Sequence, residues 1–401
     1  MILSPFNIAT PEQIKSGKTT DIYFVRTKQI LKAKGKDRTR VVAEVTTGGI
    51  PGGYPWGIIC GTDEVASLFE GVQVNVYAMS EGSLFHPYDH RGFRTPVLAV
   101  EGAYADFCEL ETPLLGLLCQ SSGVATRAAR IKLAAGDRTT IAFGVRRMHP
   151  GLAPALDRAA YIGGMDGVSS LIGAEVIGQK PSGTMPHALM VVLGDQVEAW
   201  KAFDEVMPPD VPRIFLVDTY FDEKVEAVMA ADAFGERLQA VRLDTPSSRR
   251  GDMAEIIREV RWELDLRGHN HVRIFVSGGL DEETVRIYGE AGADAFGVGT
   301  WVSGAPTVDF GFDIVEVENR PAAKRGKLGG RKQVWRCPRC LVDLVQPFKR
   351  PSPKCPICGG ETDPMLVPLI ENGKVVADIP NPRELRERVL DQIGRLTTQI
   401  S

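Results

Sequence analysis

Residues 213–228 read RIFLVDTYFDEKVEAV, and residues 273–288 read RIFVSGGLDEETVRIY. Each stretch begins with an arginine and an apolar run, passes through a polar or glycine-rich step, and continues into a charged segment with helical spacing. The apolar run predicts a strand and the charged segment a helix. Because this unit recurs 60 residues further along the chain, the sequence predicts parallel strands joined by helices.

Similar units surround these two stretches. Strands are expected at residues 139–143, 168–170, 240–244 and 293–300, and helices at residues 152–161 and 252–266. Several such units in succession predict an α/β barrel, in which the active site lies at the carboxyl ends of the strands. That rule gathers basic, acidic and glycine residues on one rim: Arg146, Arg147, His149, Ser169, His187, Asp218, Arg242, Asp244, Ser277, Gly278, Gly279, Gly297 and Gly299.

Two turns on this rim suit a phosphorylated substrate. Ser277-Gly278-Gly279 follows a predicted strand and precedes a predicted helix, so its backbone N–H groups can surround a phosphate. Gly297 to Thr300 closes the next strand. Either turn alone is equally consistent with tight backbone geometry, and their occurrence on consecutive strands favours phosphate binding.

A stiff loop, GQKPSGTMPH, occupies residues 178–187. Pro181 and Pro186 restrict its backbone, and Gly183 allows a tight bend. His187 falls at or near the start of an apolar helical pattern. A histidine in such a place more often packs or caps a helix than reacts, so its role depends on its neighbours.

Composition limits the class of protein. The chain has 401 residues, 43% hydrophobic and 24% charged, with a net charge of −4. These values predict a globular protein of two or three domains and argue against a general nucleic-acid binder. No apolar run is long enough to span a membrane, and residues 1–10 lack the pattern of a signal peptide. A cytoplasmic location is therefore expected, without a membrane partner.

Seven cysteines divide into two groups. Cys60, Cys108 and Cys119 lie among apolar residues and are expected to be packed thiols. The other four have the spacing C-x2-C-x14-C-x2-C, which predicts a closed and therefore structural zinc site formed by Cys337, Cys340, Cys355 and Cys358. The segment that precedes and enters this zinc knuckle is basic, and its simplest interpretation is a solvated loop. Its cationic residues are Lys324, Arg325, Lys327, Arg331, Lys332, Arg336 and Arg339.

Eight motifs in order resemble the nicotinate phosphoribosyltransferase family over nearly the whole chain. They are Thr20-Asp21-x-Tyr23, Phe143-Gly144-x-Arg146-Arg147, Gly167-x-Ser169-Ser170, Ser182-Gly183-Thr184-x-x-His187, Val217-Asp218-Thr219-Tyr220, Arg242-x-Asp244, Ser277-Gly278-Gly279 and Phe296-Gly297-Val298-Gly299-Thr300. The added zinc knuckle is similar to that of an archaeal branch of this family. Pro186 and Ala188 depart from the small residue and the serine that many relatives carry beside the histidine.

The resemblance implies a particular fold and assembly. The expected fold is an N-terminal α/β sandwich plus an irregular α/β barrel of the type II phosphoribosyltransferase kind, with a small C-terminal zinc-knuckle domain. Expected boundaries are residues 1–110 for the sandwich (completed by parts of 305–335), 111–305 for the catalytic barrel, 306–380 for the return strand and knuckle, and 381–401 for a C-terminal helix. The implied assembly is a homodimer with shared active sites, for which a hexamer of dimers is a further form.

The resemblance also implies roles for the rim residues. The activity would be ATP-coupled transfer of phosphoribosyl from 5-phosphoribosyl-1-pyrophosphate to nicotinate, with Mg2+ accompanying the pyrophosphate and ATP. His187 would accept a phosphoryl group from ATP, and Asp244 would bind a ribose hydroxyl. Nicotinate would contact Tyr23 of the partner subunit, Phe143, Ser169, Thr184 and Arg242. Phosphoribosyl pyrophosphate would contact Arg146, Arg147, Lys180, Asp218, Ser277, Gly278, Gly279, Gly297, Gly299 and Thr300.

Two alternatives remain open at this point. The first is another enzyme of related type, a nicotinamide or quinolinate phosphoribosyltransferase; quinolinate enzymes lack the histidine motif, so His187 opposes the quinolinate relative. A zinc-ribbon nucleic-acid-binding protein on an inactive barrel would belong to another class. Its only support is the basic run from Lys324 to Arg339, and the net negative charge opposes it.

Overall fold

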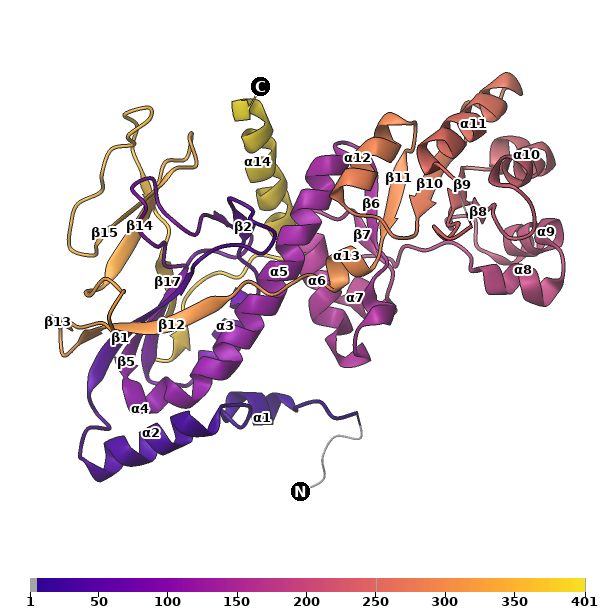
Figure 1. Cartoon of the computed structure of the whole chain (residues 1–401). Coiled ribbons are helices and arrows are strands. Elements are labelled where there is room, and N and C mark those ends of the chain that lie inside the picture. The colour runs from indigo at the N-terminus through magenta and orange to yellow at the C-terminus, as the bar shows by residue number, and fades with distance from the viewer. Residues whose placement is uncertain (1–5, 250, 401) are drawn as a thin grey trace. The chain divides into compact units, whose positions relative to one another are not determined.

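The computed structural model describes residues 6–249 and 251–400. The first five residues of the expected sandwich and Ser401 of the expected C-terminal helix lie outside this part. The chain forms two compact units (Figure 1): unit 1 comprises Met1–Thr126 and Pro306–Ser401, and unit 2 comprises Arg127–Ala305.

A seven-stranded antiparallel sheet organises unit 1, in the order β13-β12-β1-β5-β3-β17-β18. Its inner strand β1 (Arg40–Thr47) is buried at every position after Arg40, because its β-branched and small residues pack on both faces. β12 pairs with β1, so the chain returns to this sheet after leaving unit 2. The other strands are β3 (Val74–Ala78), β5 (Leu98–Ala103), β12 (Phe310–Val317), β13 (Arg320–Pro321), β17 (Val367–Glu371) and β18 (Lys374–Val375).

Helices and a short hairpin complete unit 1. Gln392 of the last helix accepts a hydrogen bond from the Leu84 backbone N–H at 2.8 Å, and its apolar residues Leu385, Val389 and Ile393 are buried. The C-terminal helix expected at residues 381–401 is thus seen as α14, which packs in unit 1 through these residues. The elements are α1 (Pro11–Lys15), α2 (Ile22–Ala33), β2 (Gly57–Ile58), α3 (Thr62–Phe69), β4 (Leu84–Phe85), α4 (Tyr104–Phe107), η1 (Cys108–Leu110) and α14 (Pro382–Ile400). Helix α5 (Glu111–Ala135) begins in unit 1 and ends in unit 2.

The four knuckle cysteines lie beside a three-stranded sheet in unit 1. Its order is β15-β14-β16, with β14 (Lys332–Arg336), β15 (Asp343–Pro347) and β16 (Asp363–Pro364). Arg336 and Asp343 form a buried pair with two contacts of 2.7 Å. That ion pair fixes the strand immediately before Cys337.

The basic run is largely neutralised within unit 1. Its cations pair with carboxylates on three strands of the large sheet and on β15: Lys324 and Lys327 with Asp313, Arg331 with Glu101, Lys332 with Glu44, and Arg336 with Asp343. The guanidinium of Arg331 also lies 4.2 Å from the ring centre of Tyr77 and 3.6 Å from that of Phe348. These contacts hold the basic run against the strands of unit 1, which gives it a structural role.

Unit 2 contains a six-stranded sheet in the order β7-β6-β11-β10-β9-β8, and every neighbouring pair is parallel. The predicted α/β class with a parallel sheet is confirmed. The strands are β6 (Thr139–Ala142), β7 (Gly167–Val168), β8 (Ile214–Leu216), β9 (Ala240–Leu243), β10 (Arg273–Ser277) and β11 (Ala295–Val298). The expected strand at residues 168–170 is shorter, because Ser170 instead caps a helix by accepting a hydrogen bond from Gly173 N–H.

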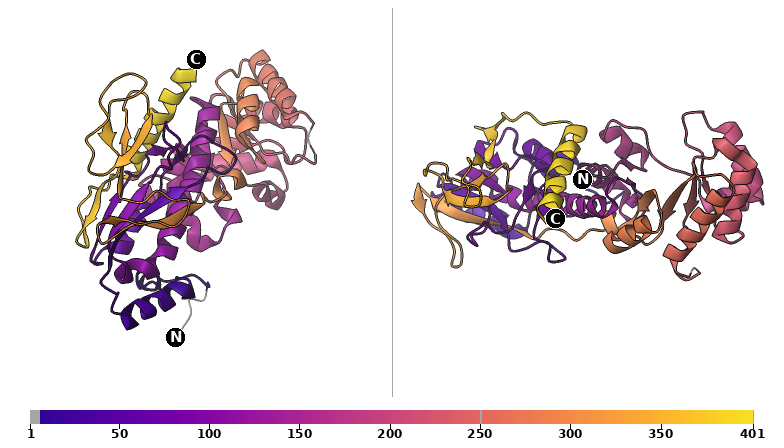
Figure 2. Two further views of the ribbon diagram at one scale, coloured as in Figure 1. Left: turned by 60° about the vertical axis from the view of Figure 1, so that its left-hand side comes forward. Right: turned by 90° about the horizontal axis from the view of Figure 1, so that it is seen from above.

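Helices follow the strands of unit 2, and α10, α11 and α12 pack along the outside of the sheet (Figure 2). The two sequence units that open with Arg213 and Arg273 become β8–α10 and β10–α12. The helices are α6 (Ala153–Ile162), α7 (Leu171–Val176), α8 (His187–Leu193), α9 (Gln196–Val206), α10 (Glu223–Phe234), α11 (Met253–Leu266), α12 (Glu282–Glu290) and α13 (Thr300–Ser303), with short 3-10 turns η2 (Val145–Arg147), η3 (Pro150–Leu152) and η4 (Gly235–Arg237).

Candidate active site

The loop before α8 is fixed by a backbone contact and by close packing. The Ser182 N–H donates to the Val168 carbonyl oxygen at 2.8 Å, which ties the loop to the end of β7. A Cβ at Gly167 would approach the Ser182 hydroxyl to 2.6 Å, so a larger residue there would push the Ser182 side chain aside. Pro186 precedes α8, and His187 is its first residue. The sequence prediction that His187 stands at a helix start is confirmed.

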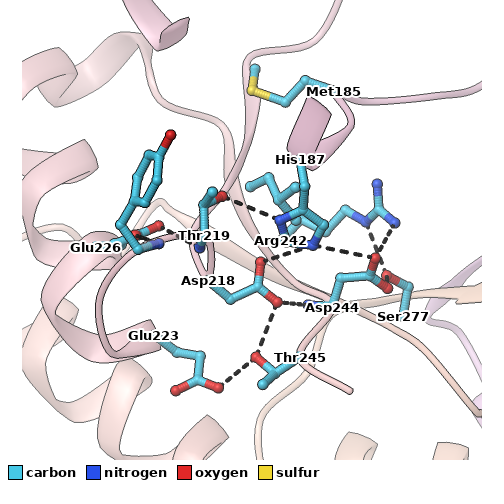
Figure 3. A network of polar contacts seen from close by, with 12 residues as sticks. Met185, His187, Asp218, Thr219, Glu223, Glu226, Arg242, Asp244, Thr245 and Ser277 are labelled. Atoms are coloured by element: carbon cyan, nitrogen blue, oxygen red, sulfur yellow. Dashed lines mark hydrogen bonds and ion pairs between the residues drawn. The ribbon is translucent and has the colours of Figure 1, made fainter. Parts of the chain in front are cut away.

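The His187 imidazole lies among groups that follow β8 and β9 (Figure 3). Its Nδ1 is 3.2 Å from the Thr219 hydroxyl, and its Nε2 is 3.6 Å from Asp218 Oδ1 and 3.8 Å from Asp244 Oδ2. The side chain is 40% exposed, so the ring is accessible to a ligand. Carboxylates beside one ring nitrogen favour a proton on that nitrogen. In the neutral ring, Nε2 therefore carries the proton and Nδ1 keeps its lone pair.

Asp218 is the buried member of this cluster, with a side chain 2% exposed. Its Oδ2 accepts hydrogen bonds from the Asp244 backbone N–H at 2.8 Å and from the Thr245 hydroxyl at 3.0 Å. Its Oδ1 is buried without a hydrogen bond and faces His187 Nε2. Burial raises the pKa of Asp218 above its ordinary value, while His187 and the two donors act in the opposite direction. A proton on Nε2 would satisfy the Oδ1 atom.

Glu226, which sequence reasoning missed, and Tyr220 of the Val217–Tyr220 motif hold the loop after β8. The buried carboxylate of Glu226 accepts from three successive backbone N–H groups, those of Thr219, Tyr220 and Phe221, at 3.1, 2.7 and 2.8 Å. The Tyr220 hydroxyl donates to the carbonyl oxygen of Met190, in the middle of α8, at 3.1 Å. These contacts fix the Thr219 hydroxyl and α8 relative to each other.

Arg242 and Ser277 form a second group next to the histidine. Arg242, on β9, donates to the Ser277 hydroxyl at 2.9 Å and to the Thr184 hydroxyl at 2.8 Å, and its guanidinium lies 3.2 Å from Asp244 Oδ2. Ser277 in turn donates to Asp244 Oδ1 at 2.7 Å. Asp244 therefore links the histidine cluster to the turn after β10 (Figure 3).

Glycine is needed in the two turns for different physical reasons. Gly278 and Gly279 adopt φ values of +95° and +70°, which residues with a Cβ rarely adopt, and the space around Gly279 is open. At Gly297 a Cβ would approach the Phe143 ring to 2.5 Å, so this glycine makes room for the aromatic ring. The Arg242 guanidinium lies 5.4 Å from the Phe143 ring centre. An aromatic surface and a cation therefore adjoin the open turn.

Most of the remaining candidate residues are exposed on the surface of their own unit. Lys180 is exposed and pairs with Asp210 at 2.5 Å, and Arg146 and Arg147 are exposed on η2. Ser169 is half-buried, its backbone N–H donating to the Ala142 carbonyl oxygen at 3.1 Å. Tyr23 belongs to unit 1 and is 55% exposed on α2. Thr300 is the exposed first residue of α13, next to Gly299.

The four cysteines of the knuckle can hold a metal ion. Their sulfur atoms all lie within 4.8 Å of one another, and those of Cys337 and Cys358 are 3.6 Å apart. Tetrahedral zinc, with Zn–S bonds of about 2.3 Å, places its sulfur ligands roughly 3.8 Å apart. The cluster fits that geometry and has no histidine or carboxylate among its members. Cys60 and Cys108 are buried thiols, as expected, and Cys119 is partly buried.

Comparison with known proteins identifies the family. Two domain models match, the N-terminal domain of quinolinate phosphoribosyl transferase over residues 21–122 and its C-terminal domain over residues 124–313. Nicotinate phosphoribosyltransferase pncB1 of Mycobacterium tuberculosis is 33% identical over 314 residues, which cover 75% of this chain and 67% of the relative. The chain belongs to the nicotinate phosphoribosyltransferase family.

Solved structures of similar proteins agree with the predicted fold. The structure described as nicotinate-nucleotide pyrophosphorylase from Pyrococcus furiosus has a TM-score of 0.94 and 56% identity, covering 98% of this chain and 99% of that one. Human nicotinic acid phosphoribosyltransferase has a TM-score of 0.72 at 21% identity, covering 94% of both chains, and shares the fold. The α/β architecture of the nicotinate phosphoribosyltransferase family is thus present. Among the described residues, no helix has both the length and the apolar composition to cross a membrane.

Proposed function

We propose that this chain transfers phosphoribosyl from 5-phosphoribosyl-1-pyrophosphate to nicotinate, giving nicotinate mononucleotide and pyrophosphate, and couples the transfer to ATP hydrolysis. This reaction belongs to NAD salvage. The observation that carries the proposal is the position of His187, with Nε2 facing two carboxylates and Nδ1 facing a hydroxyl, in one network with the Ser277–Gly279 turn. Membership of the nicotinate phosphoribosyltransferase family supports it.

His187 is the proposed phosphoryl acceptor. Its Nδ1 attacks the γ-phosphorus of ATP, a P–N bond forms, the bond between that phosphorus and the bridging oxygen breaks, and ADP leaves. The Nε2 proton stays on the ring, and the resulting positive charge faces Asp218 and Asp244. The Thr219 hydroxyl beside Nδ1 lies where it can contact the attached phosphoryl group. Transfer of that group to water then restores the neutral ring.

The ribose site is proposed at the turns after β10 and β11. Backbone N–H groups of Ser277–Gly279 and Gly297–Thr300 would hold the 5-phosphate, and Asp244, whose carboxylate stays partly exposed, would bind a ribose hydroxyl. Arg146, Arg147 and Lys180 would neutralise the departing pyrophosphate, which arrives with Mg2+ as part of the substrate. To bind the pyrophosphate, Lys180 would break its ion pair with Asp210.

Nicotinate is proposed to bind against Phe143. Its ring would stack on the aromatic face, and its carboxylate would pair with Arg242 and accept from the Thr184 hydroxyl, which already contact each other. Ser169 is neutral at this rim and would not repel a carboxylate, whereas an acidic residue would. Tyr23, exposed on α2, would cover the other ring face from a second copy of the chain.

Structural zinc is the proposed occupant of the four-cysteine cluster. Four thiolates supply the whole coordination shell, so the metal would stabilise the fold around β14 without reacting with substrate. The alternative of a nucleic-acid module has lost its support, since most cations of the basic run pair with carboxylates of unit 1.

The competing activity is transfer to quinolinate, because the matching domain models carry that name. Quinolinate has two carboxylates, whereas Arg242 is the cation that lies against Phe143, and it is already paired with Asp244. One assay decides: the purified protein is given nicotinate, nicotinamide or quinolinate, with and without ATP. Of the three bases, we expect only nicotinate to react, and we expect ATP to increase its conversion to the mononucleotide. Preferential use of either other base would overturn the assignment.

A further inference from the structure

A buried hydroxyl joins two turns of the rim. Ser303, the last residue of α13, is 6% exposed, and its hydroxyl donates to the Gly144 carbonyl oxygen at 2.9 Å. The same oxygen accepts the Arg147 backbone N–H at 3.0 Å, a bond that closes the η2 turn. A carbonyl oxygen has two lone pairs and can accept both bonds. Ser303 therefore holds the carbonyl group on which the turn of Arg146 and Arg147 is built.

The other end of α13 belongs to the turn after β11. The Gly299 carbonyl oxygen accepts the backbone N–H groups of Val302 at 3.1 Å and of Ser303 at 3.3 Å. The two turns are also in close backbone contact, because a Cβ on Gly144 would lie 2.3 Å from the Ser303 hydroxyl and 2.7 Å from the Gly299 carbonyl oxygen. A backbone carbonyl cannot rotate away as a flexible side chain can, so a larger residue at position 144 would push the turns apart.

Two arginines in the unit 2 part of α5 hold the helices that follow the glycine turns. The Arg127 guanidinium lies 3.9 Å from the ring centre of Trp301, in α13, and its Nη1 lies 3.9 Å from Glu282 Oε1. Arg130 donates to Glu282 Oε2 at 2.8 Å. Glu282 is the first residue of α12, which follows the Ser277–Gly279 turn. One helix therefore holds both glycine turns, and Ser303 ties the second of them to η2.

We propose that Ser303 and Gly144 are positioning residues that fix the distance between the glycine turns and the arginines of η2. The site is thereby matched to a ligand with an anionic group at each end, as 5-phosphoribosyl-1-pyrophosphate has. This inference rests on the proposed function, which places the 5-phosphate at the glycine turns and the pyrophosphate at Arg146 and Arg147. Neither Ser303 nor Gly144 needs to touch the substrate for this role.

A fixed distance favours one kind of ligand over another. When a ligand is bound at one end, binding of its other end is intramolecular, and this step is favourable only if the second site stands at the matching separation. Holding the two sites at that separation before the ligand arrives also reduces the ordering cost of binding. A ligand that reaches only one of the turns gains nothing from the distance between them.

The test therefore compares the spanning ligand with its two fragments. Isothermal titration calorimetry in the presence of Mg2+ gives the Kd of 5-phosphoribosyl-1-pyrophosphate, of ribose 5-phosphate and of pyrophosphate. In Ser303→Ala the Kd of the spanning ligand should rise about threefold to tenfold, as expected for the loss of one hydrogen bond. The Kd of either fragment should stay within about twofold of the wild-type value, because each turn by itself is intact.

Gly144→Ala should give a larger effect of the same kind. Its Cβ forces the backbone of the two turns to move, so the Kd of the spanning ligand should rise about tenfold to a hundredfold. Thr140→Val is the matched control, since it removes another buried hydroxyl, which donates to Asp166 Oδ2 at 3.2 Å at the opposite end of β6. This control should lower the thermal midpoint without changing the ratio of the spanning-ligand Kd to the fragment Kd values.

The outcomes separate the inference from the proposed function. If the wild type does not bind 5-phosphoribosyl-1-pyrophosphate, the proposed function fails and the inference fails with it. If the wild type binds this ligand, equal changes in all three Kd values of Ser303→Ala would overturn the inference alone, because they indicate local damage to one turn. Wild-type Kd values in Ser303→Ala would also overturn it. Ser303→Ala decides by itself if Gly144→Ala does not fold.

Discussion

The cysteine cluster and the histidine cluster are built on different principles. The four cysteines come from two C-x2-C segments beside one three-stranded sheet, and their sulfur atoms lie within 4.8 Å of one another. The histidine cluster takes His187 from a loop before α8 and its partners from the ends of β8, β9 and β10. A site whose ligands are close in sequence is specified by spacing, whereas a site assembled from several strands is specified by topology and by buried polar partners.

The two clusters should therefore fail in different ways. Damage to the histidine cluster should reduce activity in a protein that still folds, because its residues lie on a rim carried by an independent parallel sheet. Damage to the cysteine cluster should reduce stability and leave the rim intact, since the cysteines belong to unit 1 and the rim to unit 2.

Arg242→Ala gives the larger expected change in activity. Removing a charge-assisted partner costs about 1.5–3 kcal/mol, roughly tenfold to a hundredfold in affinity. The KM for nicotinate should rise by about that factor in steady-state assays, and the KM for ATP should change little. Arg242→Lys keeps the charge but loses the planar guanidinium, so its KM for nicotinate should lie between those of the wild type and Arg242→Ala. Arg273→Ala, at the opposite end of β10, is the control and should leave KM unchanged. An unchanged nicotinate KM in Arg242→Ala would remove Arg242 from the base site.

Cys340→Ser gives the smaller change in activity and the larger change in stability. Loss of one of four thiolates should lower the bound zinc, measured by elemental analysis, and the thermal midpoint. The specific activity of the folded fraction should stay within about twofold of the wild type, because the closed site has no position for substrate. Cys119→Ser, a partly buried thiol outside the cluster, serves as the control and should retain zinc. Full stability without zinc would contradict a structural role.

The sequence predicts the local features well and the long-range partners poorly. Strand–helix order, the cysteine spacing and the start of α8 at His187 all follow from periodicity, turn residues and proline positions. Glu226 and Thr245 could not be found in this way, since their roles arise only when α10 and the end of β9 meet the loop after β8. The ion pairs of the basic run could not be predicted for the same reason, because its acidic partners lie on strands distant in sequence.

The measurement that tests the central claim most directly is covalent labelling of the protein by ATP. The wild type, incubated with ATP labelled in its γ-phosphate, should acquire an acid-labile, alkali-stable phosphate, as expected of a phosphorylated imidazole nitrogen. His187→Asn should acquire none and should lose ATP hydrolysis, yet it should still bind 5-phosphoribosyl-1-pyrophosphate through the turns and arginines that remain. An Asn variant that keeps its label and its stimulation by ATP would contradict the account and leave His187 as a packed residue at a helix start.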